Sequence, residues 1–332
     1  MKKILYFILP CLLIAACNKQ EEPQNTPQEE IYTINISTSG EFSTADSPLT
    51  KTGDASNYLY AIRFIKIASN PVLNETFALG LFDSTEGISV NLVAGEQYIV
   101  QATLIKNGKE LLTTDSQGRY NDYVISNMQL TNSFFYHYRR GIIIDYPSFS
   151  YDYSNLNTSV GRDGNVGKVT YQYDRYYGEI ASYTPVVNGT INIELKHVAY
   201  GLKYKVVGLT DGSLALTVIN AAPAQSETDT YTLFNVSGIN SDTESDGSIF
   251  QCRDIYSAWQ YPSTYKETVT LSLQWTRGIG ITQDLGSVDI DVLRNRMNII
   301  NINLGAQDGD ASLGINTEDA EMGNESVTIN VG

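Results

Sequence analysis

Apolar and polar residues alternate along many short stretches of this chain. Tyr32, Ile34 and Ile36 share one face of a run at residues 31–36, and Ile191, Ile193 and Leu195 do so further on. A period of two residues is typical of a β-strand with one buried face. The same reasoning predicts strands at residues 58–67, 97–105, 190–207, 268–275, 279–282, 297–304 and 327–331.

Turn-forming pairs separate several of these runs. Asn107-Gly108 lies between residues 97–105 and Leu111-Leu112, and Asn188-Gly189 and Asp211-Gly212 repeat the pattern. These pairs tolerate the positive φ angles of a tight turn, so they predict β-hairpins. Short strands with frequent turns favour an all-β fold of two antiparallel β-sandwich domains. We place these domains at residues 31–185 and 186–332.

The first residues have the order of a secretory signal. Lys2 and Lys3 precede an apolar run to Ile14, which ends in Ile14-Ala15-Ala16-Cys17. The run is shorter than the ~20 residues of a membrane-spanning helix, so residues 1–16 are predicted to be a signal peptide. The ending looks like a lipobox, which predicts lipidation at Cys17. The alternative is an ordinary signal peptide with a chance cysteine. Residues 17–30 then form a polar, flexible tether.

Charge and cysteine content narrow the possible functions. The chain has 22 basic and 37 acidic residues. Removal of Lys2 and Lys3 with the signal leaves 20 basic and 37 acidic residues, a formal charge of −17. Such a surface repels nucleic acid and anionic lipid. Cys11 leaves with the signal and Cys17 carries lipid, so Cys252 has no partner for a disulfide within the chain.

Few residues are typical of catalysis. The two histidines, His137 and His197, have no Gly-x-Ser-x-Gly elbow to accompany them, and zinc sites usually need more His and Cys. We therefore expect no catalytic residue, no metal and no cofactor, although weak surface Ca²⁺ binding at residues 308–319 stays open. Tyrosines crowd residues 134–183, where they either border the core or stack on a glycan.

Several short motifs together resemble the fimbrillin-like lipoproteins of Bacteroidetes. They are the lipobox, the acidic segment 18–22, Thr50-Lys51-Thr52, residues 195–199 and residues 293–299. The resemblance implies two transthyretin-like β-sandwich domains and a stalk, tip or anchor role in a type V pilus. It also implies assembly without catalysis. An arginine- or lysine-directed protease removes an N-terminal segment of stalk subunits, and a neighbour's strand fills the vacated groove. Lys51 is the candidate cleavage site here, because Arg63 lies inside a predicted strand.

These observations predict a non-enzymatic lipoprotein of the outer membrane, anchored through the lipid on Cys17. Its expected partners are other pilin subunits or further copies of itself, and cleavage would place it in an extracellular fimbrium that contributes to adhesion. Val327, Ile329 and Val331 share one face of the last strand and form the candidate donor strand. Alternatively, this strand closes its own domain. The alternative function is glycan binding beside an outer-membrane importer; a host ligand is also possible.

Overall fold

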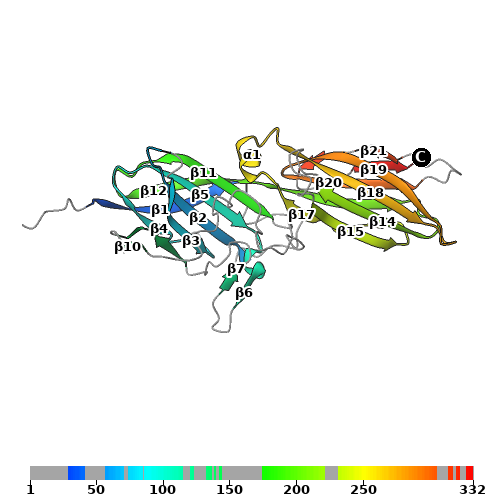
Figure 1. Cartoon of the computed structure of the whole chain (residues 1–332), viewed down its shortest axis with the longest axis horizontal. Helices are drawn as coiled ribbons and strands as arrows, with labels where there is room; N and C mark the ends of the chain where they lie inside the picture. The colour runs from blue at the N-terminus through cyan, green and yellow to red at the C-terminus, as the bar shows by residue number, and fades with distance from the viewer. Residues whose placement is uncertain are drawn as a thin grey trace, which may run out of the picture. The chain divides into compact units, whose positions relative to one another are not determined.

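Strands make up nearly all of the regular structure in this chain (Figure 1). The computed structural model describes residues 29–41, 57–70, 74–84, 86–114, 120–122, 132–136, 138–139, 142–143, 174–220, 231–304, 313–316, 319–321 and 327–331. Residues 31–332 form one compact unit. No helix in these ranges is long and apolar enough to cross a membrane.

The strands of the first part of the chain are β1 (Ile31–Gly40), β2 (Leu59–Lys66), β3 (Glu75–Phe82), β4 (Ser89–Val93), β5 (Tyr98–Ile105), β6 (Leu112–Thr114), β7 (Tyr120–Asp122), β8 (Ser133–Tyr136), β9 (Tyr138–Arg139), β10 (Ile142–Ile143), β11 (Arg175–Tyr183) and β12 (Gly189–His197). A 3₁₀ helix, η3, spans Gly108–Leu111.

The remaining elements are β13 (Ala199–Val207), β14 (Ser213–Asn220), β15 (Tyr231–Ile239), β16 (Thr243–Glu244), β17 (Ser248–Gln251), α1 (Ile255–Gln260), β18 (Lys266–Thr276), β19 (Thr282–Leu293), β20 (Arg296–Leu304), β21 (Leu313–Asn316), β22 (Asp319–Glu321) and β23 (Val327–Val331).

Eight strands form the first large sheet, in the order β4-β1-β12-β11-β5-β2-β3-β8. The sheet curls so that its two edge strands approach each other, because the backbone N–H of Asn91 on β4 donates to the hydroxyl of Tyr136 on β8 at 3.0 Å. The curled sheet encloses one hydrophobic core, the first core. It contains Ile34, Phe64, Val100, Leu104 and Ile193, among others.

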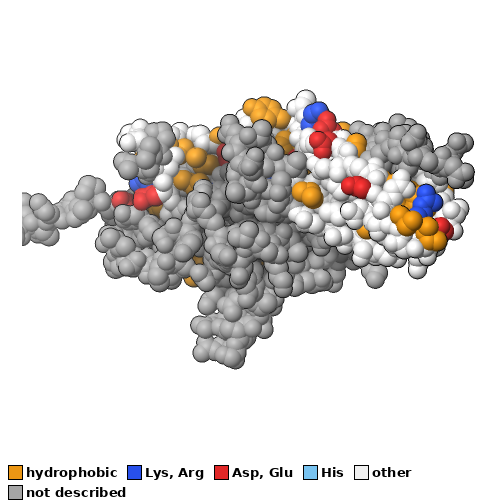
Figure 2. Space-filling model, turned by 45° about the vertical axis from the view of Figure 1, so that its right-hand side comes forward, with side chains coloured by type: hydrophobic (Ala, Val, Ile, Leu, Met, Phe, Trp, Pro, Cys, Tyr) orange, Lys and Arg blue, Asp and Glu red, His pale blue; other side chains and the backbone are white. Residues whose placement is uncertain are grey.

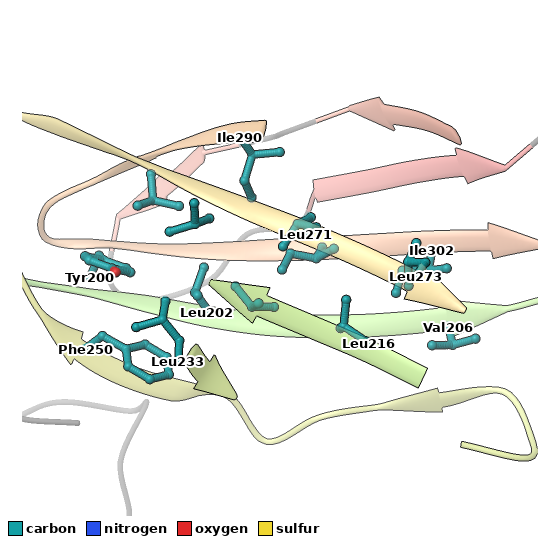
Figure 3. Packing of buried hydrophobic residues seen from close by; sticks show 14 of the residues in the cluster. Tyr200, Leu202, Val206, Leu216, Leu233, Phe250, Leu271, Leu273, Ile290 and Ile302 are labelled. Atoms are coloured by element: carbon teal, nitrogen blue, oxygen red, sulfur yellow. The ribbon is translucent and has the colours of Figure 1, made fainter. Parts of the chain in front are cut away.

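A second core lies between two further sheets. One contains β16-β13-β20-β23-β21, with β17 on β13 and β22 on β20, and the other has the order β15-β14-β18-β19. Figure 3 shows their side chains meeting: Tyr200, Leu202 and Ile302 come from the first of these sheets, and Leu216 and Leu271 come from the second.

One nearly continuous strand passes from the first core to the second. Ile193 and Leu195 of β12 are buried in the first core, whereas Tyr200 and Leu202 of β13 are buried in the second. The chain therefore passes from the first core to the second near His197. The domain division between residues 185 and 186 stays a prediction, as does a transthyretin-like or immunoglobulin-like topology.

The strand predictions agree well with the elements themselves. The runs at 31–36, 58–67, 268–275, 297–304 and 327–331 correspond to β1, β2, β18, β20 and β23, and the all-β class is confirmed. The strand predicted at residues 279–282 is wrong for its first three residues, which lie in the turn before β19 begins at Thr282.

The predicted tight hairpins at the three turn-forming pairs do not form. β11 and β12 pair antiparallel only with Tyr176 opposite His197 and Tyr177 opposite Lys196, away from Asn188-Gly189, and neither Asn188 nor Gly189 has a positive φ. No hairpin forms at Asn107-Gly108, because β2 and β11 already occupy both edges of β5 and β6 pairs with β7. Asp211-Gly212 turns the chain from β13 to β14, which belong to different sheets.

Candidate functional site at the first strand

The first strand lies inside its sheet, between two strands that are distant in sequence. β1 pairs antiparallel with β4, from Ile31 opposite Val93 to Asn35 opposite Ser89. On its other side it runs parallel to β12, with Ile34 opposite Gly189 and Gly40 opposite Leu195. Removing β1 would therefore expose two strand edges at once.

The inner face of β1 contributes to the first core. Ile34 is fully buried and Ile36 is nearly so, while Thr33 and Asn35, which alternate with them, are exposed. Their buried neighbours include Val90 and Leu92 of β4 and Ile191 of β12. Full burial of an isoleucine stabilises the folded state by about 1.5–3 kcal/mol. The slot that β1 fills is therefore apolar on the side that faces the first core.

Polar contacts fix the register of β1. The backbone N–H of Thr33 donates to Oδ1 of Asn188 at 2.7 Å, and the Thr33 hydroxyl donates to Oδ1 of Asn91 at 2.9 Å. Further along, the Ser37 hydroxyl donates to the carbonyl of Ile191 at 3.1 Å. A shift of one residue would break these contacts and turn the isoleucines outward.

The C-terminal end of β1 requires a glycine, and the residue after it forms an ion pair. Gly40 has a φ of +142°, and a Cβ there would lie 1.9 Å from the carbonyl oxygen of Leu195. Glu41 follows, and its carboxylate accepts from the Arg294 guanidinium at 2.7 Å and 2.9 Å. It also accepts from the backbone N–H of His197 at 2.9 Å. The Glu41–Arg294 pair thus joins the end of β1 to the segment between β19 and β20.

Electrostatics favour the ionised form of Glu41. Partial burial by itself would raise the pKa of its carboxyl, but the hydrogen bond and charge of Arg294, together with the His197 N–H, outweigh it and lower the pKa below the ordinary value. Arg294 is nearly buried and also donates from Nε to the carbonyl of Pro262 at 2.9 Å. Glu41 is the acidic partner of this guanidinium, and removing one partner of a buried ion pair leaves the other uncompensated.

His197 lies beside this pair in a fully partnered polar cluster. Its Nε2 is 2.7 Å from Oδ1 of Asp174 and its Nδ1 is 2.7 Å from Oδ1 of Asn295. The ring of Tyr176 stacks on it at 4.4 Å. Both ring nitrogens are already bonded, and no serine, threonine or cysteine side chain bonds to them in the part of the chain described. A nucleophilic triad would need such a contact.

The candidate donor strand pairs within its own chain. β23 runs parallel to β20, with Val327 opposite Ile300 and Val331 opposite Leu304, and antiparallel to β21. This is the arrangement expected if the strand closes its own domain. Donation of Val327, Ile329 and Val331 to another copy stays a prediction.

Two of the predicted site residues lie outside the described residues. They are Cys17 and Lys51; Lys51 falls between β1 and β2 in the sequence. Among the described members of the tyrosine-rich stretch, Tyr176 and Tyr177 are buried, as expected if the tyrosines border the core. No group of three or more His, Cys, Asp or Glu side chains that could hold a metal occurs in the described ranges. The Glu41–Arg294 pair has no signal in the sequence, because its partners are 253 residues apart.

Comparisons with known proteins give only distant likenesses. No family model and no curated protein matches the chain. Solved structures similar to it include the fimbrial anchor protein Mfa2 from Porphyromonas gingivalis, with 8% identity, a TM-score of 0.40 and coverage of 91% of this chain and 98% of that one. The tip fimbrial protein Mfa3 from the same organism has 12% identity, a TM-score of 0.36 and coverage of 92% and 100%.

A fimbrial assembly protein from Parabacteroides distasonis has 13% identity, a TM-score of 0.35 and coverage of 91% and 100%. These descriptions agree with the family that the sequence resembles.

Proposed function

We propose that this chain is a surface lipoprotein that assembles with other copies or related subunits into a fimbria, by exchange of the strand that fills the β1 slot. The lipid on Cys17 anchors the chain to the outer membrane. Cleavage after Lys51 then releases β1, and the last strand of a neighbouring subunit takes its place. The chain acts as an assembly subunit that contributes to adhesion, and not as an enzyme.

The observation that carries the proposal is the match between β1 and β23. Residues 33–36 read Thr-Ile-Asn-Ile and residues 328–331 read Thr-Ile-Asn-Val. With these aligned, Ile329 takes the place of the buried Ile34, and Val331 takes that of Ile36. The exposed Asn35 is replaced by Asn330. The donated strand would thus present the same apolar face to the same slot.

Strand direction is compatible with the exchange. β1 runs parallel to β12 and β23 runs parallel to β20. A donated β23 can therefore make parallel pairing on β12 like that which it already makes on β20. Its three aliphatic side chains would each contribute about 1.5–3 kcal/mol before the loss of chain entropy is subtracted.

The position of Lys51 supports the release step. It lies between β1, which ends at Gly40, and β2, which begins at Leu59. A cut there leaves β1 held by strand pairing, its two isoleucines and the Glu41–Arg294 pair. Those contacts keep the slot filled until a competing strand arrives, which protects two edges from uncontrolled pairing.

Limited trypsin digestion tests the first step. We expect a new N-terminus at Thr52, and Lys51→Gln should abolish it while leaving the melting temperature unchanged. First cuts elsewhere in the folded protein would contradict the release of β1. In cells, Cys17→Ala should move the protein from the membrane fraction to the soluble fraction; continued membrane retention would contradict the lipid anchor.

A synthetic peptide tests the second step without disturbing the monomer. The peptide spans residues 325–332 and is added to the chain cut after Lys51. We expect it to bind and to block assembly, whereas a peptide with Ile329→Asp and Val331→Asp should do neither. The uncut Lys51→Gln chain should bind neither peptide. Equal binding of both peptides to the cut chain would refute the match to the β1 slot.

A further inference from the structure

Exposed aliphatic side chains gather at two separate places on the described surface. Seven large hydrophobic side chains are exposed, and six of them fall into two groups. The base surface consists of Ile31, Val186 and Val187, and the tip surface consists of Val207, Ile279 and Ile281. Their exposed fractions lie between 40% and 80%. The seventh, Tyr261, belongs to neither group.

Hydrogen bonds and pairing hold the base surface together. Ile31 pairs with Val93 on β4. The backbone N–H of Gly95 donates to the carbonyl of Pro185 at 3.2 Å, which attaches the turn that carries Val186 and Val187. Ile31 belongs to β1 and leaves with it, whereas Val186 and Val187 lie outside β1 and stay in the chain.

The tip surface is equally well fixed. The indole Nε1 of Trp275 donates to the carbonyl of Asp211 at 2.8 Å, and the N–H of Gly278 donates to the Asp211 carboxylate at 3.1 Å. The Arg277 guanidinium lies 3.4 Å from the centre of the Trp275 ring. Figure 2 shows hydrophobic side chains beside a basic one at the right-hand end of the view, where β18 ends in Figure 1. Trp275 itself is buried in the second core, so the indole fixes Arg277 in place at the edge of this surface. Arginine is enriched among the residues that dominate binding between proteins.

The topology places these surfaces at opposite ends of the nearly continuous strand formed by β12 and β13. Val187 lies two residues before β12, which begins at Gly189. Val207 is the last residue of β13. Two different surfaces on one chain can form a heterologous contact between copies, and such a contact repeats without closing when the copies are related by translation.

We infer that the tip surface of one copy packs against the base surface of the next copy, an end-to-end contact that accompanies the strand exchange proposed above. β23 runs toward the Leu304 end of β20, which is the tip end, since Leu304 lies against Gly208 directly after Val207. β1 runs away from the base, from Ile31 toward Gly40. A strand that leaves the tip of one copy therefore continues into the base of the next copy in the direction that β1 takes.

Disulfide capture between copies tests this contact. One chain carries Ile279→Cys and a second carries Val187→Cys, both with Cys17→Ala; Cys252 stays because it is fully buried. After mixing and mild oxidation, we expect at least tenfold more tip–base dimer than from a control pair in which Tyr261→Cys replaces Ile279→Cys. Added salt should increase capture, since it screens the repulsion between two acidic chains.

The outcomes separate this contact from strand exchange. Equal capture with Tyr261→Cys, or more tip–tip than tip–base dimer, would overturn the contact. The experiment is repeated with Lys51→Gln in both chains, which keeps the β1 slot closed while both surfaces stay exposed. Capture there, without polymer from the cut chain, would support the contact and refute strand exchange. Polymer from the cut chain without tip–base capture would overturn the contact and leave strand exchange standing.

Discussion

Replacing Glu41 with glutamine isolates the ion pair that ends β1. Glu41→Gln keeps the shape of the side chain but removes the charge that faces Arg294. At pH 7 we expect the free energy of unfolding to fall by about 1–2 kcal/mol. A hydrogen bond to a charged group contributes about 1.5–3 kcal/mol, and we reduce that range because the Glu41 side chain is 34% exposed and partly screened by solvent.

The effect should depend on pH in a defined direction. The pKa of Glu41 is lower in the folded protein than its ordinary value of 4.5. The ion pair therefore stabilises the fold fully above pH 4.5, and its contribution disappears as the pH falls through the folded pKa. The difference between wild type and Glu41→Gln should be largest at pH 7 and smaller at about pH 3.

Urea unfolding at both pH values measures the effect. Glu194→Gln is the matched control, because Glu194 is an exposed carboxylate on the neighbouring β12. The control should change the unfolding free energy by less than about 0.5 kcal/mol. An equal loss in the two variants at pH 7, or a Glu41→Gln loss that persists unchanged at low pH, would refute the stabilising role of the pair.

Three further predictions concern a buried isoleucine, a glycine with a positive φ and a buried thiol. Ile34→Ala should lower the unfolding free energy by about 2–5 kcal/mol, because Ile34 is fully buried; Asn35→Ala, on the exposed face, should change it by less than about 0.5 kcal/mol in the same urea titration. Gly40→Ala should destabilise by at least about 1–3 kcal/mol, since its φ of +142° disfavours a side chain and a backbone oxygen fills the space. At Gly189 an added Cβ would meet only the Val187 carbonyl oxygen, at an unstrained 4.0 Å. Gly189→Ala should therefore be nearly neutral in the same thermal melt, and similar losses in both variants would refute the constraint. Burial raises the pKa of the Cys252 thiol, and Glu267 adds to the shift; iodoacetamide should therefore label Cys252 in urea but not in the folded protein, and rapid labelling without urea would contradict its burial.

The sequence by itself determined which segments are strands and which of their faces are buried. Alternation placed Ile34 and Ile36 inward on β1, as the structure confirms. This succeeds because the period of two is a local property of an extended chain, and burying the apolar face is favourable in any sheet.

Only the tertiary structure decided which strands are neighbours. Thr-Ile-Asn-Ile occurs at residues 33–36 and again at 190–193, and Thr-Ile-Asn-Val occurs at 328–331. The first lies between β4 and β12, the second between β1 and β11, and the third between β20 and β21. Backbone hydrogen bonds between strands are the same for every residue type except proline, so nearly identical segments can take different partners. Packing of the whole core selects among them, and the same selection brings Glu41 to Arg294 across most of the chain.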